Sequence, residues 1–213
     1  MATISEQQLG LVKKLYYKKK LGVPEIARTL KTSVDATYYF MRLHKLERRS
    51  NREQNLARFE LKVPSFVLKQ KLSIKEEILR IAGVMLYWGE GYQSLEASGV
   101  DFANSKPEMI LVFLKFLRTV CGIQEKRLKA YLYCYSNQNP RQLISFWSGI
   151  TKIPVQQFTK PYVRSDFDKT KIDKMRYGLL HVRYYDKKLL YVIRDWINRY
   201  IKDLGILYGQ LGE

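Results

Sequence analysis

The sequence predicts an α+β protein built from a small helical unit and a larger unit that mixes helices and strands. Residues 5–43 place apolar side chains at helical spacing, whereas residues 127–135 alternate strictly between apolar side chains and basic or aromatic ones. Between these regions the periodicity fades into a polar, basic stretch. We therefore expect three segments: a helical unit at 1–50, a basic linker at 51–72 and a mixed domain at 73–213.

The charge of the chain favours a polyanionic partner. Its 213 residues include 38 Lys+Arg and 20 Asp+Glu, which give a formal net charge of +18. Nucleic acid is the commonest polyanion that such a protein meets, although an anionic membrane surface or a need for solubility would also produce a basic chain. With 46% hydrophobic residues, the chain can also bury a sizeable core.

Several function classes receive no support from the sequence. No apolar run approaches the ~20 residues that span a bilayer, and residues 1–6 lack the pattern of a signal peptide. We therefore expect a cytoplasmic protein, associated with the nucleoid when bound to DNA, and no membrane partner. Two cysteines and two histidines are too few for a zinc site, so Cys121 and Cys134 are expected in the core. Neither a Gly-rich phosphate loop nor a Ser/His/Asp arrangement is evident.

The amino-terminal unit predicts three short helices. A capping box at Ser5 opens the first, residues 24–30 form the second, and Ser33 caps the third over residues 34–43. The segment from Val23 to Ser33 resembles a helix-turn-helix, in which the third helix enters the major groove of DNA. The residues expected to meet base edges are Ser33, Val34, Asp35, Thr37, Tyr38, Tyr39 and Arg42. A three-helix unit that binds protein is the alternative.

Basic residues flank this helical unit on both sides. Lysines precede the second helix, and Arg48 and Arg49 follow the third. Such clusters neutralise phosphates and supply a sequence-independent affinity that falls steeply with salt. We therefore expect Arg48 and Arg49 to contact the DNA backbone. The stretch that follows them is expected to order on DNA or to remain a solvated tether.

A long apolar helix opens the second domain and ends at an isolated acid. Ser73 and Glu76 form a capping box for a helix over residues 74–90. The residues expected on its inward face are Ile74, Ile78, Leu79, Ala82, Met85 and Leu86. Glu90 lies between two glycines at what we expect to be the buried end of this helix, where a metal ion or a partner helix could use its carboxylate.

The remaining sequence is typical of helices packed on one face of an antiparallel sheet. Strands are expected at 100–102, 127–135, 160–164 and 180–185, and helices at 109–120, 140–150 and 188–204. Basic and aromatic side chains share one face of the strands. Those expected to contact a DNA groove are Arg127, Lys129, Tyr131, Tyr133, Lys160, Tyr162, Arg164 and Arg183. An ordinary solvated face, or one that stacks unpaired RNA bases, would show the same pattern.

From Ser73 to Leu204 the chain resembles the LAGLIDADG homing endonuclease family. The resemblance rests on a helix ending in Leu86-Tyr87-Trp88-Gly89-Glu90-Gly91, then a strand, a helix opened by Asn104-Ser105-Lys106-Pro107-Glu108, further strands and a closing helix. The chain departs from the family pattern at Met85, where a small glycine is usual, and at Trp88, where an acid is often found.

The resemblance implies a sequence-specific protein for double-stranded DNA that acts as a homodimer through the helix 74–90. In that family the acid at the end of each motif helix helps to hold a divalent metal, which assigns Glu90 as the catalytic residue and as a ligand of Mg²⁺. A helix-turn-helix fused to this fold also resembles bacterial regulators that kept the scaffold for binding and lost cleavage. Two hypotheses remain: a metal-dependent endonuclease, and a transcriptional or mobile-element regulator that does not cut DNA.

Overall fold

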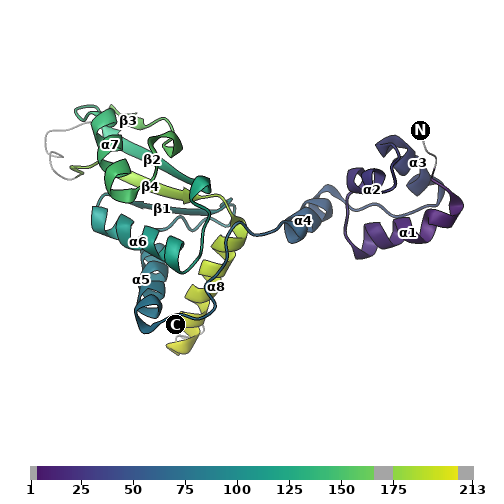
Figure 1. Ribbon diagram of the computed structural model, residues 1–213, viewed down its shortest axis with the longest axis horizontal. Helices are drawn as coiled ribbons and strands as arrows, with labels where there is room; N and C mark the ends of the chain where they lie inside the picture. Colours follow the sequence, from purple (N-terminus) through teal and green to yellow (C-terminus); the bar gives the residue numbers. More distant parts are fainter. Residues whose placement is uncertain (1–3, 166–174, 206–213) are drawn as a thin grey trace, which may run out of the picture. The chain divides into compact units, whose positions relative to one another are not determined.

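The computed structural model describes residues 4–165 and 175–205. The chain divides into two compact units, Met1–Val63 and Pro64–Glu213, which we call unit 1 and unit 2. Each unit has its own hydrophobic core. Unit 1 is helical, whereas unit 2 combines helices with a four-stranded sheet (Figure 1). The α+β class expected from the sequence is therefore confirmed.

Unit 1 is a set of short helices around a small core. Its elements are the 3-10 helix η1 (Glu6–Gln8), α1 (Leu9–Lys13), the π-helical turn η2 (Lys14–Lys18), α2 (Val23–Thr29), α3 (Val34–Leu43) and α4 (Asn51–Leu61). The Ser33 hydroxyl caps α3 by accepting a hydrogen bond from the backbone N–H of Ala36 at 3.0 Å, as the sequence predicts. The turn before it takes a left-handed conformation at Lys31, with φ of 54°. Ile26, Phe40 and Met41 are buried in the core.

Helix α4 lies inside the stretch that we expected to be a basic linker. The cause is a second capping box: the Ser50 N–H donates to the Glu53 carboxylate at 2.7 Å, and the Glu53 N–H donates to the Ser50 hydroxyl at 3.3 Å. The rest of the expected linker belongs to unit 2. There the Val67 N–H donates to the carbonyl of Gly122 at 3.1 Å. Residues 51–72 are thus divided between the two units.

Asp186 fixes the start of unit 2 to the rest of that unit. Its carboxylate is buried and accepts hydrogen bonds from the Ser65 N–H at 2.8 Å and the Ser65 hydroxyl at 2.7 Å. The same carboxylate caps a helix by accepting from the Lys188 N–H at 2.9 Å. Burial by itself would raise the pKa of Asp186, but the hydrogen bonds from Ser65 and the following backbone outweigh it and hold that pKa below its usual value.

Unit 2 places four helices against a mixed sheet. Its elements are α5 (Ile74–Glu90), β1 (Val100–Asn104), α6 (Pro107–Thr119), η3 (Glu125–Arg127), β2 (Leu128–Tyr135), α7 (Pro140–Thr151), η4 (Val155–Gln157), β3 (Tyr162–Arg164), β4 (Leu179–Tyr184) and α8 (Lys187–Asp203). The strand order is β1-β4-β2-β3. Strand β4 is antiparallel to β1 and to β2, as expected, but β3 is parallel to β2. The expectation of a purely antiparallel sheet was therefore wrong, because α7 carries the chain back to the starting end of β2.

Helices cover one face of the sheet, and within residues 4–165 and 175–205 no helix of unit 2 covers the other. Along β2 and β4, alternate residues such as Leu132 and Val182 are fully buried and join a core that includes residues of α5, α6, α7 and α8. Residues of the opposite face are partly exposed, as the alternation in the sequence predicts; Tyr135, at the end of β2, is the exception because it is buried. Figure 1 shows α5 beside both α6 and α8. We call the uncovered side of the sheet the open face.

Helix α5 packs into unit 2 by a side that matches our expectation only in part, since Leu79, Met85 and Leu86 pack against the core as expected. Its buried residues are Gly83, Val84 and Tyr87, whereas Ile74 and Ile78 are exposed. A Cβ added at Gly83 would lie 2.2 Å from the Phe116 ring of α6, so the glycine is required for the close packing of these helices. Periodicity identified only part of the buried side, because α5 carries apolar residues on more than one side and spacing alone does not select between them.

Candidate nucleic-acid interface

The register of the strands brings charged residues into one row on the open face. Arg183 of β4 pairs with Asp101 of β1 on one side and with Lys129 of β2 on the other. In the next row, His181 pairs with Ala103 of β1 and with Tyr131 of β2. Lys129, Tyr131 and Arg183 thus lie together on the open face, as the sequence analysis expected.

Asp101 organises the cations around it. Its two carboxylate oxygens lie 2.9 Å from His181 Nδ1 and 2.7 Å from Arg183 Nε. Burial alone would raise the pKa of Asp101, but the hydrogen bond and charge of His181, together with the Arg183 guanidinium, hold that pKa below its usual value. Asp101 and His181 were not among the DNA contacts expected from the sequence, because only the strand register shows that they meet.

Aromatic rings fill the centre of the open face. The Tyr133 ring lies 4.9 Å from Tyr131, 5.2 Å from Tyr162 and 4.7 Å from His181, measured between ring centroids. Both tyrosine neighbours meet Tyr133 edge to face, so these rings do not form a flat stacking platform. The Arg183 guanidinium lies 5.0 Å from the centroid of Tyr131. This packing fixes the positions of the basic groups and gives no specific support to base stacking by RNA.

The other expected sheet contacts lie toward the edges of the open face. Lys160, Tyr162 and Arg164 are exposed on or beside β3, the edge strand. The Arg164 guanidinium lies 5.8 Å from the ring centroid of Tyr135. Arg127 precedes β2, and its guanidinium donates to the carbonyl of Tyr185 at 3.0 Å. Arg127 therefore has a structural contact in addition to any contact that it makes with DNA.

In unit 1, helix α3 exposes only part of the expected DNA-reading set. Asp35, Tyr39 and Arg42 are exposed and recur at helical spacing, so they share one outer face. Thr37 is fully buried, and its hydroxyl donates to the carbonyl of Ser33 at 2.9 Å. The expectation that Thr37 meets base edges was wrong, because its side chain faces the core of unit 1. Ser33 uses its hydroxyl as the helix cap described above.

The two arginines that follow α3 have different roles. Arg48 is exposed, and its guanidinium lies 4.6 Å from the ring centroid of Tyr38. Arg49 is half-buried, with its guanidinium 4.1 Å from the ring centroid of Tyr16 and a hydrogen bond of 3.0 Å to the carbonyl of Lys20. Arg49 thus holds the end of the first helical segment, and its expected role as a phosphate contact loses support. Arg48 keeps an exposed position.

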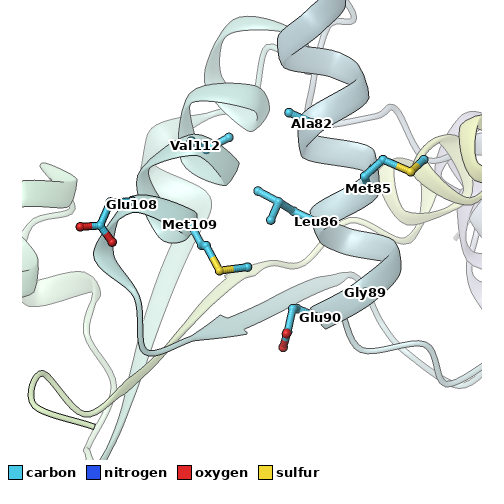
Figure 2. Close-up of a pocket in the computed structure, with 8 residues that line it drawn as sticks. All are labelled: Ala82, Met85, Leu86, Gly89, Glu90, Glu108, Met109 and Val112. Carbon is cyan, nitrogen blue, oxygen red and sulfur yellow. The ribbon is translucent and has the colours of Figure 1, made fainter. Parts of the chain in front are cut away.

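Glu90, the acid expected to be catalytic, lies at an exposed helix end. It is the last residue of α5 and borders a pocket of about 600 Å³ between α5 and α6. Figure 2 shows Leu86 and Met109 beside this pocket, Glu90 below it and Glu108 turned away. The expectation of a buried helix end was wrong because Gly91 leaves the helix to pair with Phe102 at the edge of the sheet. Among the described residues, no group of three His, Cys, Asp or Glu side chains is arranged to hold a metal.

The outer side of α5 is an uninterrupted apolar stripe. Its members follow one another at spacings of four and three residues, and all are at least partly exposed: Ile74, Ile78, Ile81, Met85 and Trp88. This is the spacing at which apolar side chains form a seam between two packed helices. Gly89 lies beside the stripe, and a Cβ added there would meet no atom within 4 Å. The stripe is what we call the α5 seam.

Over the described parts of the chain, we find no helix with the length and apolarity to cross a membrane. Comparison of the chain with protein-family models, with curated proteins and with solved structures finds no match.

Proposed function

We propose that this chain is a sequence-specific protein for double-stranded DNA. In this proposal unit 1 acts as a helix-turn-helix, with Asp35, Tyr39 and Arg42 of α3 directed to base edges in the major groove. Unit 2 lies on the duplex through its open face, where Lys129 and Arg183 contact phosphates. The observation that carries the proposal is the open face itself, because a helix-free side of a sheet with aligned cations suits a polyanionic duplex better than it suits a protein partner.

We also propose that the protein acts as a homodimer through the α5 seam. A continuous apolar stripe on an exposed helix side is costly in water and is stabilised when a second helix covers it. A second copy is the natural occupant, because a two-fold axis beside α5 would place each seam against itself. Two open faces would then address the two halves of a roughly palindromic DNA site. This arrangement is the one that the LAGLIDADG resemblance implies.

Whether the dimer cuts DNA depends on Glu90. Mg²⁺ is bound through one or two protein carboxylates together with phosphate oxygens. One Glu90 from each protomer fits that donor set, since Glu90 is exposed and makes no hydrogen bond among the described residues. A Mg²⁺ ion held there would polarise the scissile phosphate and activate a water. Binding without cleavage, as in a transcriptional or mobile-element regulator, is the alternative, and the following experiment separates the two.

A randomised duplex library, incubated with the full chain with and without Mg²⁺, should yield a discrete recovered site. For an endonuclease, Glu90→Gln should lower the rate of DNA cleavage by roughly 100-fold or more, since even outer-shell partners of a metal contribute 10- to 100-fold. The same substitution should change the affinity for DNA by no more than about twofold. Glu108→Gln, which removes the neighbouring carboxylate of the same pocket, is the matched control and should leave cleavage intact. A recovered site with intact ends would make the protein a regulator. Failure to recover any duplex would overturn the proposal of DNA binding.

Lys129→Gln should weaken DNA binding and make it less sensitive to salt. Each phosphate contact that is lost removes one released counterion, so the slope of log K against log salt should fall by ~0.9. Fluorescence anisotropy with a labelled duplex at several salt concentrations measures this slope. Lys202→Gln on α8 makes the same charge change away from the open face, where Lys202 is exposed, and should leave the slope unchanged. Equal slopes for the two variants would show that the open face is not the DNA-binding surface.

A further inference from the structure

His181 has an unusual position among the ionisable groups of the open face. It lies on β4, the strand between β1 and β2, and its side chain is 17% exposed. One ring nitrogen, Nδ1, lies 2.9 Å from the Asp101 carboxylate, whose other oxygen accepts from Arg183. Rings of Tyr131 and Tyr133 lie on the β2 side. The imidazole is therefore held in place from both neighbouring strands.

The contact with Asp101 decides which ring nitrogen is available. An ionised carboxylate only accepts hydrogen bonds, so Nδ1 carries the proton that lies between the two residues. Nε2 makes no hydrogen bond within the described part of the chain. It is then an acceptor when the ring is neutral and a charged donor when the ring takes up a second proton. An oriented imidazole with one partnered and one unpartnered nitrogen is typical of a functional histidine.

The neighbours of His181 set the charge that a ligand would meet. The charged and titratable groups nearest to His181 on this face are Asp101 from β1, Arg183 from β4, Lys129, Tyr131 and Tyr133 from β2, and Tyr162 from β3; Tyr185, which follows β4, contacts Arg183. Glu90 ends α5 just before the bridge between Gly91 and Phe102, at the β1 edge. The single Asp101 carboxylate offsets one of the two cations beside His181, Lys129 and Arg183. A second proton on His181 adds to the positive charge that remains around it, and an anion would balance this charge.

We propose that His181 is a proton-linked contact to a DNA phosphate at the centre of the open face, with Asp101 as its positioning residue. The inference rests on the proposed function and adds a specific residue and a dependence on protons to it. Protonated Nε2 donates a charge-assisted hydrogen bond to a phosphate oxygen, alongside Lys129 and Arg183. Binding of the duplex then takes up a proton at His181, and affinity rises as the pH falls through the range in which histidine titrates.

The test is the affinity of the full chain for its recovered duplex between pH 8 and pH 6 at fixed salt. One linked proton changes the binding constant by at most about tenfold per pH unit. We expect the wild-type affinity to rise by at least ~5-fold over this range, and this rise to be lost in His181→Gln. At pH 6 the variant should also show a salt slope lower by ~0.9, with no such difference at pH 8.

The chain provides a matched control, because it contains only two histidines. His44 lies in unit 1, 3.5 Å from the Glu6 carboxylate, and His44→Gln should keep the pH dependence of the wild type. Asp101→Asn keeps His181 but removes the carboxylate that positions it, so this variant should reduce the pH dependence of the affinity for DNA. NMR of the two histidine rings of the wild-type protein, free and bound to DNA, gives a readout that needs no variant to fold: the signals of His181 should change to those of the doubly protonated ring when the duplex is added.

The outcomes separate this inference from the proposal of DNA binding. If the pH dependence of duplex binding survives in His181→Gln, or if the His181 ring takes up no proton in the complex, the role of His181 is overturned and DNA binding still stands. Absence of duplex binding at every pH would overturn both. If the pH dependence of binding is lost in His44→Gln and kept in His181→Gln, the proton-linked contact lies in unit 1, and the inference is contradicted.

Discussion

Ile78→Asp is expected to convert the homodimer into a monomer without unfolding unit 2. Ile78 is 62% exposed in the protomer and lies in the middle of the α5 seam, so its replacement costs little in a single chain. In a two-fold interface the substitution occurs twice and brings two carboxylates together in an apolar seam. We expect the dimer dissociation constant to increase by at least ~100-fold, equivalent to about 3 kcal/mol. Sedimentation over a range of concentrations measures it.

Leu95→Asp is the matched control for this prediction. Leu95 is 84% exposed and lies in the loop after α5, outside the seam. Leu95→Asp introduces the same charge in unit 2 as Ile78→Asp does, and it should leave the dissociation constant of the dimer unchanged. Circular dichroism should show both variants folded. If Ile78→Asp sediments as the wild type does, the second copy either does not associate or uses another surface, and the α5 seam would need a different occupant.

Asp186→Ala should produce a large loss of stability in unit 2. The substitution removes the acceptor for the Ser65 N–H, the Ser65 hydroxyl and the Lys188 N–H at a side chain that is 3% exposed. Buried donors left without a partner each cost on the order of 1–3 kcal/mol, so we expect a decrease of about 3 kcal/mol in the free energy of unfolding. All three tryptophans, Trp88, Trp147 and Trp196, lie in unit 2, so their fluorescence in urea reports on this unit alone.

The pH dependence of this loss follows from the direction of the pKa shift. Because the pKa of folded Asp186 lies below its value in the unfolded chain, the stabilisation is fully present above the unfolded pKa, ~4, and is lost as pH falls through the folded pKa. The difference between wild type and Asp186→Ala should therefore narrow below about pH 4. Asp195→Ala, on the exposed side of α8, breaks only a surface ion pair with Arg199 and should cost at most ~1 kcal/mol. A similar loss in both variants would contradict the role of Asp186.

Elements whose boundaries depend on local chemistry were predicted well from the sequence. The Ser33 cap begins α3 and the Ser73 capping box begins α5, in each case because a side chain satisfies backbone N–H groups within three residues of it. Gly122, with φ of +57°, follows α6 as expected, and an added Cβ there would lie 2.1 Å from the carbonyl oxygen of Val67. The same reasoning, applied to Ser50 and Glu53, would also have found α4.

Features that depend on tertiary contacts were predicted less well. The buried side of α5 is set by its packing against Phe116, which is far away in sequence. Thr37 faces inward, whereas Asp35 and Tyr39, two residues before and after it, are exposed. The pairing of Asp101 with His181 and Arg183 needs the register of β1 against β4, which no local pattern contains. For the candidate site, the sequence therefore identified the basic and aromatic residues of the open face but not the acid that arranges them.

The two sides of α5 are under separate constraints. On the inner side, Gly83 lies against Phe116, so variation there is limited by whether unit 2 can close its core at all. On the outer side, Ile74, Ile78 and Ile81 of the α5 seam are exposed, whereas Met85 of the seam also packs against the core of unit 2. Sequence change along Ile74, Ile78 and Ile81 can therefore alter which chains associate while the fold stays as it is. Because the two sides of α5 have different roles, related chains can change their association partners more readily than they change their fold.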